Sequence, residues 1–361
     1  MTRRFSIGAV PIGGGAPVSV QSMTNTDTRD VQATLTQIRA LCTAGADIVR
    51  VSVYDDACVP ALGEIIKALQ SGGKAVPIVA DIHYRADLAI AALEAGVAKV
   101  RINPGNIGSA EKIKRVADCA KAHGAPIRVG VNAGSIAKDV LRKYGGITAE
   151  GMVESALSHA ALLEKAGFAD IVLSLKASDV PLTVKAYQLA SKACDYPLHL
   201  GVTEAGLPGE GHVKSAVGIG SLLLQGIGDT LRVSLTGDPV PEIAAGISIL
   251  KACGLREEGI NIVSCPTCGR AGIDVAGIAA RVQEELSDSK MPLTVAVMGC
   301  VVNGPGEARE ADFGIAGGGH GKGVLFQKGK PPESVEGDLA GILIQRVRSY
   351  QREQSRAHTS P

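Results

Sequence analysis

The stretch Ile48-Val49-Arg50-Val51-Ser52 carries the pattern that decides the fold of this chain. Its β-branched residues predict a buried strand, and a segment of helical periodicity, 31–43, comes before it. Short strand-like runs of this kind alternate with helix-length segments from residue 18 to residue 253. The strand-like runs are 18–23, 48–53, 77–81, 99–102, 127–131, 171–175, 198–202 and 231–235.

The intervening segments carry the signals that begin and end helices. Asp30 precedes the first of them, Gly45 follows it, and Pro241 stands in the first turn of the last. Apolar strands that alternate with helices imply a parallel sheet, and eight such units predict a (β/α)8 TIM barrel over residues 1–254. An open doubly wound sheet is the alternative, but no G-x-G-x-x-G turn follows the first strand. The expected helices include 31–43, 86–95, 111–123, 151–166, 183–193, 214–225 and 241–253.

A different pattern follows residue 254. A charged hinge leads to a strand at 260–264, a helix at 275–287, a second strand at 293–298 and a third near 313–316. A helix near 334–349 completes a small α/β domain over residues 255–350, which is a plausible size for a separate domain. The polar tail at 351–361 is expected to be disordered.

Composition limits the function. The chain has 361 residues, 45% of them apolar, with a net charge of +1 and only 3% aromatics. These values argue against binding to nucleic acid or to an anionic membrane surface. No apolar run reaches transmembrane length and no signal peptide is visible, so we expect a soluble, cytoplasmic protein. The 8 cysteines are not expected to form a disulfide framework there.

Cationic side chains gather where the predicted strands end. In several strands the polar residues stand two or four apart, so they point to the same side. Chemistry in TIM barrels takes place at the carboxyl ends of the strands. Any single arginine there could be a strand-end salt bridge, but several from different strands predict a site for a polyanion, most simply a diphosphate. The residues are Arg50, Ser52, Arg101, Asn103, Arg128, Asn132, Ser174, Lys176, Arg232 and Ser234.

One carboxylate faces this predicted cationic ring. Glu204 follows the seventh strand and either neutralises an arginine or exchanges a proton with the substrate. Asp81 and His83, at the end of the third strand, are weaker candidates. His199 lies within a strand, where a structural role is the better interpretation.

The smaller domain carries a metal-binding pattern. Cys265-Pro266-Thr267-Cys268 follows its first strand, and the second strand leads to Cys300 and then to Glu307. A C-x-x-C turn places two thiols on one side of a metal. No fourth cysteine follows Cys300, so the site either keeps an open metal position or is completed by an oxygen ligand. A three-cysteine structural zinc site is the alternative to an iron–sulfur cluster.

In these motifs the chain resembles the bacterial two-domain 4-hydroxy-3-methylbut-2-enyl diphosphate synthases. The resemblance covers nearly the whole chain. It includes the runs 20–26, 46–52, 79–83, 101–108, 130–135, 176–180, 198–206 and 228–235, as well as both cysteine motifs.

The resemblance implies a function and a set of site residues. It implies an oxidoreductase of isoprenoid biosynthesis that opens and dehydrates 2-C-methyl-D-erythritol 2,4-cyclodiphosphate, with flavodoxin or ferredoxin as electron donor. It further implies a homodimer whose active site is shared between subunits. The implied ligands of a 4Fe–4S cluster are Cys265, Cys268, Cys300 and Glu307, and the implied acid/base is Glu204. The implied substrate contacts are Arg50, Arg101, Arg128, Asn132, Lys176, Arg232 and Ser234.

A non-redox interpretation of the same residues stays open at this stage. In it, the barrel belongs to a phosphosugar or pterin-type lyase or transferase, and zinc stabilises the smaller domain.

Overall fold

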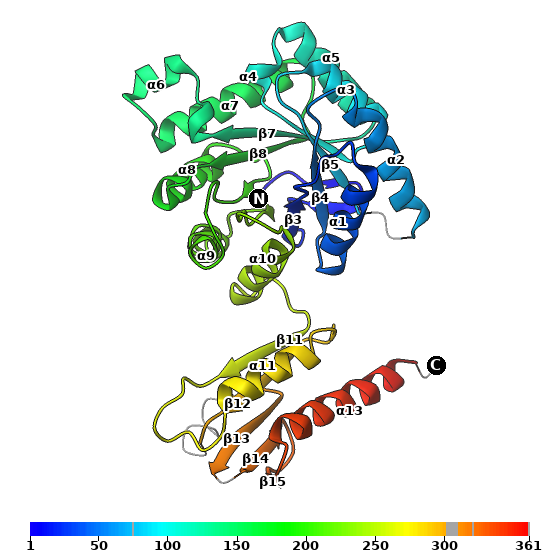
Figure 1. The fold of residues 1–361 in the computed structure, drawn as a ribbon. Helices are drawn as coiled ribbons and strands as arrows, with labels where there is room; N and C mark the ends of the chain where they lie inside the picture. The colour runs from blue at the N-terminus through cyan, green and yellow to red at the C-terminus, as the bar shows by residue number, and fades with distance from the viewer. Residues whose placement is uncertain (74–75, 301–309, 320, 360–361) are drawn as a thin grey trace. The chain divides into compact units, whose positions relative to one another are not determined.

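A computed structural model describes residues 1–73, 76–300, 310–319 and 321–359. The chain divides into two compact units, Met1–Arg256 and Glu257–Pro361 (Figure 1). No described helix is long and apolar enough to cross a membrane.

The first unit is a parallel barrel with helices on its outside (Figure 1). The sheet has the order β8-β7-β6-β5-β4-β3-β10-β9. A bridge between Leu173 of β8 and Leu198, next to β9, joins the two ends of this order. The predicted TIM barrel is therefore confirmed. Its strands are β3 (Ser19–Met23), β4 (Ile48–Ser52), β5 (Ile78–Asp81), β6 (Lys99–Ile102), β7 (Ile127–Asn132), β8 (Ile171–Lys176), β9 (His199–Leu200) and β10 (Thr230–Leu231).

The outer helices begin where side chains cap them. Asp30 accepts a hydrogen bond from the Ala33 amide at the start of α1, and Asp179 accepts one from Leu182 at the start of α8. The helices are α1 (Val31–Thr43), α2 (Cys58–Ser71), α3 (Ala86–Glu94), α4 (Pro104–Ile107), α5 (Ala110–Ala122), α6 (Lys138–Tyr144), α7 (Ala149–Lys165), α8 (Val180–Ala193), α9 (Glu210–Leu223) and α10 (Val240–Ala252), with a 3₁₀ turn, η1 (Ala133–Ser135).

A hairpin that the sequence pattern did not predict closes the amino-terminal end of the barrel. It consists of β1 (Phe5–Ile7) and β2 (Val10–Ile12), paired antiparallel. Ile7 and Ile12 are completely buried and form an apolar cluster with Ile48, Val79 and Val172 of the barrel strands. This apolar floor keeps water away from the lower end of the barrel interior.

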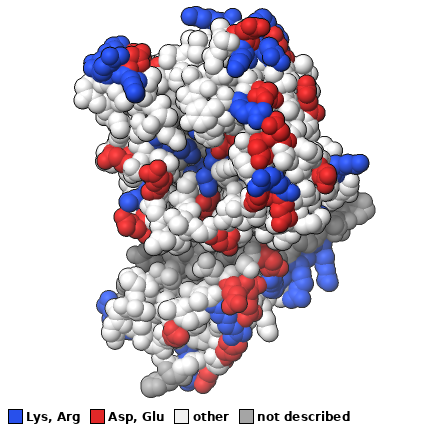
Figure 2. All heavy atoms as spheres, turned by 45° about the horizontal axis from the view of Figure 1, so that its top comes forward, with Lys and Arg blue, Asp and Glu red and all other residues white. Residues whose placement is uncertain are grey.

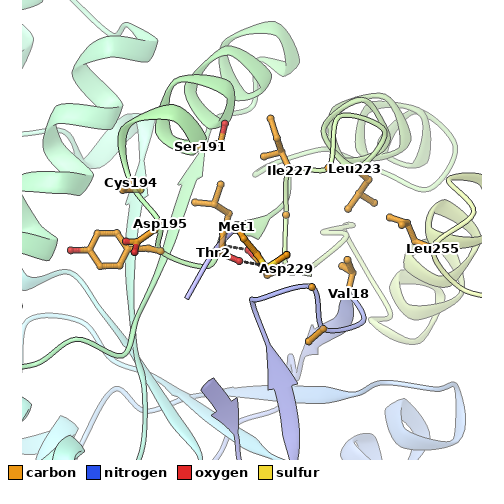
Figure 3. A pocket seen from close by; sticks show the side chains of 16 residues that line it. Met1, Thr2, Val18, Ser191, Cys194, Asp195, Leu223, Ile227, Asp229 and Leu255 are labelled. Carbon is orange, nitrogen blue, oxygen red and sulfur yellow. Dashed lines mark hydrogen bonds between the residues drawn. The ribbon is translucent and has the colours of Figure 1, made fainter. Parts of the chain in front are cut away.

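A pocket of about 620 Å³ lies beside the floor (Figure 3). In it, the Thr2 hydroxyl donates to Asp229 at 2.6 Å, and the Leu198 amide donates to the same carboxylate at 2.8 Å. Leu198 and Asp229 immediately precede β9 and β10. The pocket is therefore at the end of the barrel opposite to the carboxyl ends of the strands, and we assign it to anchoring of the amino terminus.

The second unit is a five-stranded mixed sheet in the order β11-β12-β13-β14-β15. The first three strands are parallel and the last three antiparallel. Among the described elements, the helices α11 and α13 contribute to one apolar core against the sheet, with Val282 and Val347 completely buried in it. The elements are β11 (Ile260–Ser264), β12 (Leu293–Met298), β13 (Phe313–Gly319), β14 (Lys322–Gln327), β15 (Glu333–Glu336), α11 (Val275–Glu285) and α13 (Leu339–Thr359).

Two expectations for this unit were wrong. Residues 333–336 form the edge strand β15, so the last helix begins at Leu339 and not near 334. The tail expected to be disordered from residue 351 is helical through Thr359. Its Gln, Arg, Glu and Ala residues are good helix formers, with no glycine or proline before Pro361. Gln351 also donates to the Ser289 hydroxyl at 2.6 Å, which attaches the tail to the unit.

The floor hairpin gives a first testable prediction. Ile12→Ala removes a completely buried side chain and should lower the free energy of unfolding of the barrel by about 2–5 kcal/mol. Urea unfolding followed by circular dichroism measures this loss. The control is Val213→Ala, at a side chain that is 63% exposed, where a change within about 0.5 kcal/mol is expected. Equal effects of the two substitutions would show that the hairpin does not support the barrel.

Candidate active site in the barrel and candidate metal centre

The carboxyl half of the barrel interior is lined by cations. Arg50 of β4, Arg101 of β6, Arg128 of β7 and Lys176 of β8 are all buried. In the strand register Arg101 lies opposite Arg128, and Asn132 lies opposite Lys176. Figure 2 shows blue Lys and Arg atoms within a recess of the surface, whereas red and blue atoms are interspersed over the surrounding face.

Asp81, at the end of β5, joins two of these cations. Its carboxylate accepts from Arg101 Nη1 at 3.1 Å and lies 3.8 Å from Arg50 Nε. Burial disfavours the ionised carboxyl, but the charges of Arg50, Arg101 and Arg128 outweigh burial and hold the pKa of Asp81 well below its usual range. The carboxylate therefore stays ionised and holds the two guanidinium groups in place.

His83 takes part in the same network. Arg101 Nη1 lies 2.7 Å from His83 Nε2, so that nitrogen acts as the acceptor of a neutral imidazole. Burial and the charge of Arg101 lower the pKa of His83. Asp81 and His83, the weaker candidates from the sequence, are thus placed directly against the cationic residues.

Arg232 has a different partner. Its guanidinium makes two hydrogen bonds with the Glu242 carboxylate, at 3.1 and 3.2 Å, in a bidentate arrangement. Glu242 belongs to α10, is 2% exposed, and also accepts from Ser22. Arg232 is therefore neutralised by the protein itself, and this carboxylate was missed in the sequence because it lies on a helix and not at a strand end.

Arg128 and Lys176 lack such compensation. Within the described part of the chain, no carboxylate lies at ion-pair distance from either side chain, and Arg128 Nε and Nη1 have no hydrogen-bond partner. Burial, reinforced by neighbouring arginines, lowers the pKa of Lys176 well below its usual value. Buried donors without acceptors are rare in proteins. Their presence here marks a place prepared for an anionic ligand.

Two inward-facing glycines make room for these long side chains. A Cβ atom at Gly130 would lie 2.7 Å from Arg101 Nε, and one at Gly201 would lie 2.5 Å from Lys176 Nζ. Both approaches are closer than real Cβ atoms tolerate. The sequence carried a signal for Gly130, because it stands two positions after Arg128 and therefore on the same side of β7.

Of the remaining predicted residues, Asn103 and Ser174 are buried, whereas Asn132, Ser234 and Glu204 are more exposed. Asn132 and Ser234 are half-buried, and the backbone amide of Asn132 is held by the Ser135 hydroxyl at 3.0 Å. Glu204 is exposed, and its backbone has φ 53°, in the left-handed region. Tyr84, which follows β5, has φ 65°. Such conformations are costly for residues other than glycine and cluster at functional sites.

The three cysteines of the second unit lie on loops that follow neighbouring parallel strands. Cys265 follows β11 and Cys300 follows β12. The Gly299 amide donates to Cys265 Sγ at 3.1 Å. The Gly272 amide donates to the Gly299 carbonyl at 2.8 Å, which folds the loop that carries Cys268 against the loop that carries Cys300.

The chemistry of these thiols suits a metal centre. None of the eight cysteines forms a disulfide. Hydrogen bonds from the backbone and side chain of Arg270 lower the pKa of Cys268, which favours the thiolate that binds iron or zinc. Among the described side chains, no group of three or more His, Cys, Asp or Glu is arranged to hold a metal ion. Glu307, the predicted fourth ligand, lies outside the described residues.

Comparison with known proteins identifies the family. Residues 2–247 match the GcpE TIM-barrel domain, and residues 261–349 match the GcpE protein C-terminal domain. A protein of Caldanaerobacter subterraneus is 56% identical over 355 residues, with 98% of both chains covered, and one of Geobacter sulfurreducens is 56% identical over 347 residues, with 96% of this chain and 97% of that one covered. Both are named 4-hydroxy-3-methylbut-2-en-1-yl diphosphate synthase (flavodoxin).

Solved structures of low identity agree on the barrel alone. Dihydropteroate synthase from Stenotrophomonas maltophilia has a TM-score of 0.51 at 15% identity, over 70% of this chain and 97% of that one. The Yersinia pestis enzyme has a TM-score of 0.51 at 13% identity, over 70% of this chain and 100% of that one. The two domain matches and the near full-length relatives decide the assignment. The chain belongs to the GcpE family.

Proposed function

We propose that this chain catalyses the reductive ring opening and dehydration of 2-C-methyl-D-erythritol 2,4-cyclodiphosphate to 4-hydroxy-3-methylbut-2-enyl diphosphate, in the methylerythritol phosphate pathway of isoprenoid biosynthesis. It is an oxidoreductase. The observation that supports this substrate best is the buried excess of positive charge at Arg128 and Lys176, which have no carboxylate partner among the described residues. A cyclic diphosphate supplies the anionic oxygens that these donors lack.

The reaction sets the tasks of the side chains. The cyclodiphosphate dianion takes up two electrons and one proton, and it yields the open-chain diphosphate trianion and water. The bond from carbon to a phosphate oxygen breaks, so negative charge grows on the diphosphate as the ring opens. The cationic interior stabilises that charge with donors that are already in place and buried from water. The residues assigned to this task are Arg50, Arg101, Arg128, Lys176, Arg232 and Ser234, with Asn132 as a further substrate contact.

We assign the proton to Glu204. Loss of the hydroxyl group as water requires a proton donor on the same side as the departing oxygen. Glu204 lies beyond β9, at the carboxyl end of the barrel. Its left-handed backbone conformation restricts the direction of its Cα–Cβ bond. An exposed carboxylate at this position exchanges protons with solvent between turnovers.

The cofactor proposed for the second unit is a 4Fe–4S cluster held by Cys265, Cys268, Cys300 and Glu307. The donor set fits it, because three soft thiolates and one harder carboxylate leave one iron with an exchangeable ligand. When bound, such a cluster supplies electrons one at a time. The loops after β11 and β12 bring the thiol residues to one end of the sheet, and the Gly299 amide that donates to Cys265 Sγ would tune that sulfur.

Partners follow from the same proposal. We assign flavodoxin or ferredoxin as the one-electron donor. We also propose a homodimer with a shared active site. An apolar groove of about 880 Å³ between α9 and α10, lined by the exposed side chains of Val217 and Leu224 among others, supports a contact between subunits. The eight cysteines without disulfides suit a reducing, cytoplasmic location.

Turnover tests the proposal directly. Anaerobic protein reconstituted with iron and sulfide, given the cyclodiphosphate and a chemical one-electron reductant, should form the open-chain allylic diphosphate. Phosphorus NMR identifies it, because ring opening changes the environment of both phosphorus atoms. An inactive protein that binds about four irons per chain would point to another anionic substrate. A colourless, zinc-containing protein would instead support the non-redox lyase or transferase.

The cluster ligands have a matched cysteine control. Cys268→Ser should reduce the iron content to well below half of that of the unchanged protein, because serine is a poor ligand for iron in such clusters. Cys42→Ser, at a half-buried thiol of α1, should leave the iron content unchanged. Iron and sulfide analysis with the visible spectrum measures both. Equal iron contents in the two variants would remove Cys268 from the ligand set.

A conservative substitution tests the proton donor. Glu204→Gln keeps the shape of the side chain but cannot donate a proton, so kcat should fall by about 10²–10⁴-fold. Binding of the cyclodiphosphate, measured by calorimetry on the oxidised protein, should change little. Full activity of this variant would leave Glu204 with no role beyond charge balance.

A further inference from the structure

A lysine deep in the barrel has no role in the site described above. Lys99 opens β6, two residues before Arg101, so both side chains point to the same side of the strand. Its side chain is completely buried, one layer closer to the floor than Arg101. Its ammonium donates to Gln21 Oε1 at 3.4 Å. Because Gln21 belongs to β3, which is not next to β6 in the sheet, this contact crosses the barrel interior.

The surroundings of Lys99 contain cations and donors. Arg128 of β7 and Arg50 of β4 are the charged groups that act on it most strongly, and both repel its charge. His199 of β9 is completely buried, and its Nδ1 lies 3.3 Å from the Thr230 hydroxyl. Burial, followed by the charges of Arg128 and Lys176, lowers the pKa of His199 well below its usual value, so its ring is neutral and offers no counter-charge to Lys99.

The carboxylates nearest to this layer are already paired with other cations. The carboxylate of Asp81 is engaged by Arg101 and Arg50, and that of Glu242 by Arg232. Among the described residues, no carboxylate lies at ion-pair distance from Lys99. Gln21 Nε2, Arg128 Nε and His199 Nε2 are buried donors or ring nitrogens without a hydrogen-bond partner.

This geometry decides which group gives up its charge. A buried cation without a counter-ion is strongly disfavoured, so one member of such a cluster loses its proton. Arginine does not deprotonate in proteins, whereas lysine shifts readily. The cluster holds two buried lysines. Lys176 ends β8 and keeps 7% exposure, whereas Lys99 begins β6 and is completely buried, so Lys99 is the one farther from solvent and from the ligand. Burial, followed by the charges of Arg128 and Arg50, lowers the pKa of Lys99 well below its usual value.

We propose that Lys99 is a positioning residue of the diphosphate site, uncharged beneath Arg128 in the ligand-free protein and protonated when a diphosphate binds above it. The inference rests on the proposed function and deepens it. Anionic oxygens at Arg128 remove the repulsion that keeps the amine neutral, so the binding of substrate takes up a proton. Lys99 then acts through Arg128 and adds positive charge below the diphosphate without touching it.

The cyclodiphosphate is a clean probe for this proton. Each of its phosphorus atoms carries one strongly acidic oxygen and no weakly acidic one, so protons taken up near pH 8 go to the protein. Calorimetric titration of the oxidised holoenzyme, in buffers with different enthalpies of ionisation, counts these protons. Lys99→Met should bind with about one proton fewer per chain than the unchanged protein. Lys114→Met, at an exposed lysine paired with Asp118, should take up the same number as the unchanged protein.

The pH dependence of the affinity for the cyclodiphosphate is a second measurement of this proton uptake. Because binding takes up a proton, affinity should fall as pH rises through the range between the pKa of Lys99 in the free protein and its pKa in the complex. It should fall less steeply in Lys99→Met. A merely structural lysine would change affinity equally at every pH. If the methionine variant does not fold, Lys99→Gln keeps a hydrogen-bonding group toward Gln21 and is held to the same criteria.

The two proposals fail in different ways. If the unchanged holoenzyme does not bind the cyclodiphosphate, the proposed function is lost, and the inference on Lys99 with it. If it binds with the same proton uptake and the same pH profile as the Lys99 variants, the role of Lys99 is overturned while the proposed function stands.

Discussion

The contact of the Asp81 carboxylate with Arg101 and Arg50 is the interaction on which the site depends. Two guanidinium groups that point into one barrel repel each other, and a single buried carboxylate between them makes their arrangement stable. Glu242, on helix α10, neutralises Arg232 in a similar way. The protein thus compensates part of its internal charge. The uncompensated remainder, at Arg128 and Lys176, is available for a ligand.

Such an interior is unusual for the fold. TIM barrels normally fill their centre with layers of bulky apolar residues. Here apolar packing is confined to the floor, where Ile7 and Ile12 of the hairpin meet the first residues of the strands. The charged layers lie above it, and Gly130 and Gly201 leave space for long side chains to cross the interior. The likeness to dihydropteroate synthases is therefore one of backbone architecture, whereas the side chains of the interior decide the chemistry.

The sequence predicted some features better than others, for physical reasons. The eight barrel strands and the bounds of β11 and β12 followed from local patterns, because short runs rich in Val, Ile and Leu between helix-length segments are typical of parallel strands. The hairpin of β1 and β2, the strands β14 and β15, and the helical tail were missed or wrong. Their segments are short or polar, and the contacts that hold them are tertiary, such as Ile12 on the floor and Gln351 on Ser289. The periodicity of a short segment cannot predict such tertiary contacts.

For the candidate site, the sequence alone determined the fold class, the family and the residue types at the strand ends, since strand parity places every second side chain on one face. It also determined the cysteine spacing that defines the candidate metal centre. Only the tertiary structure decided which cations are neutralised and which are not. Asp81 was only a weak candidate in the sequence, and no local pattern marked Glu242 or Lys99. The partners that give these residues their roles are far along the chain. Burial and charge balance are properties of that three-dimensional neighbourhood, so no local pattern could have ranked Arg128 above Arg232 or drawn attention to Lys99.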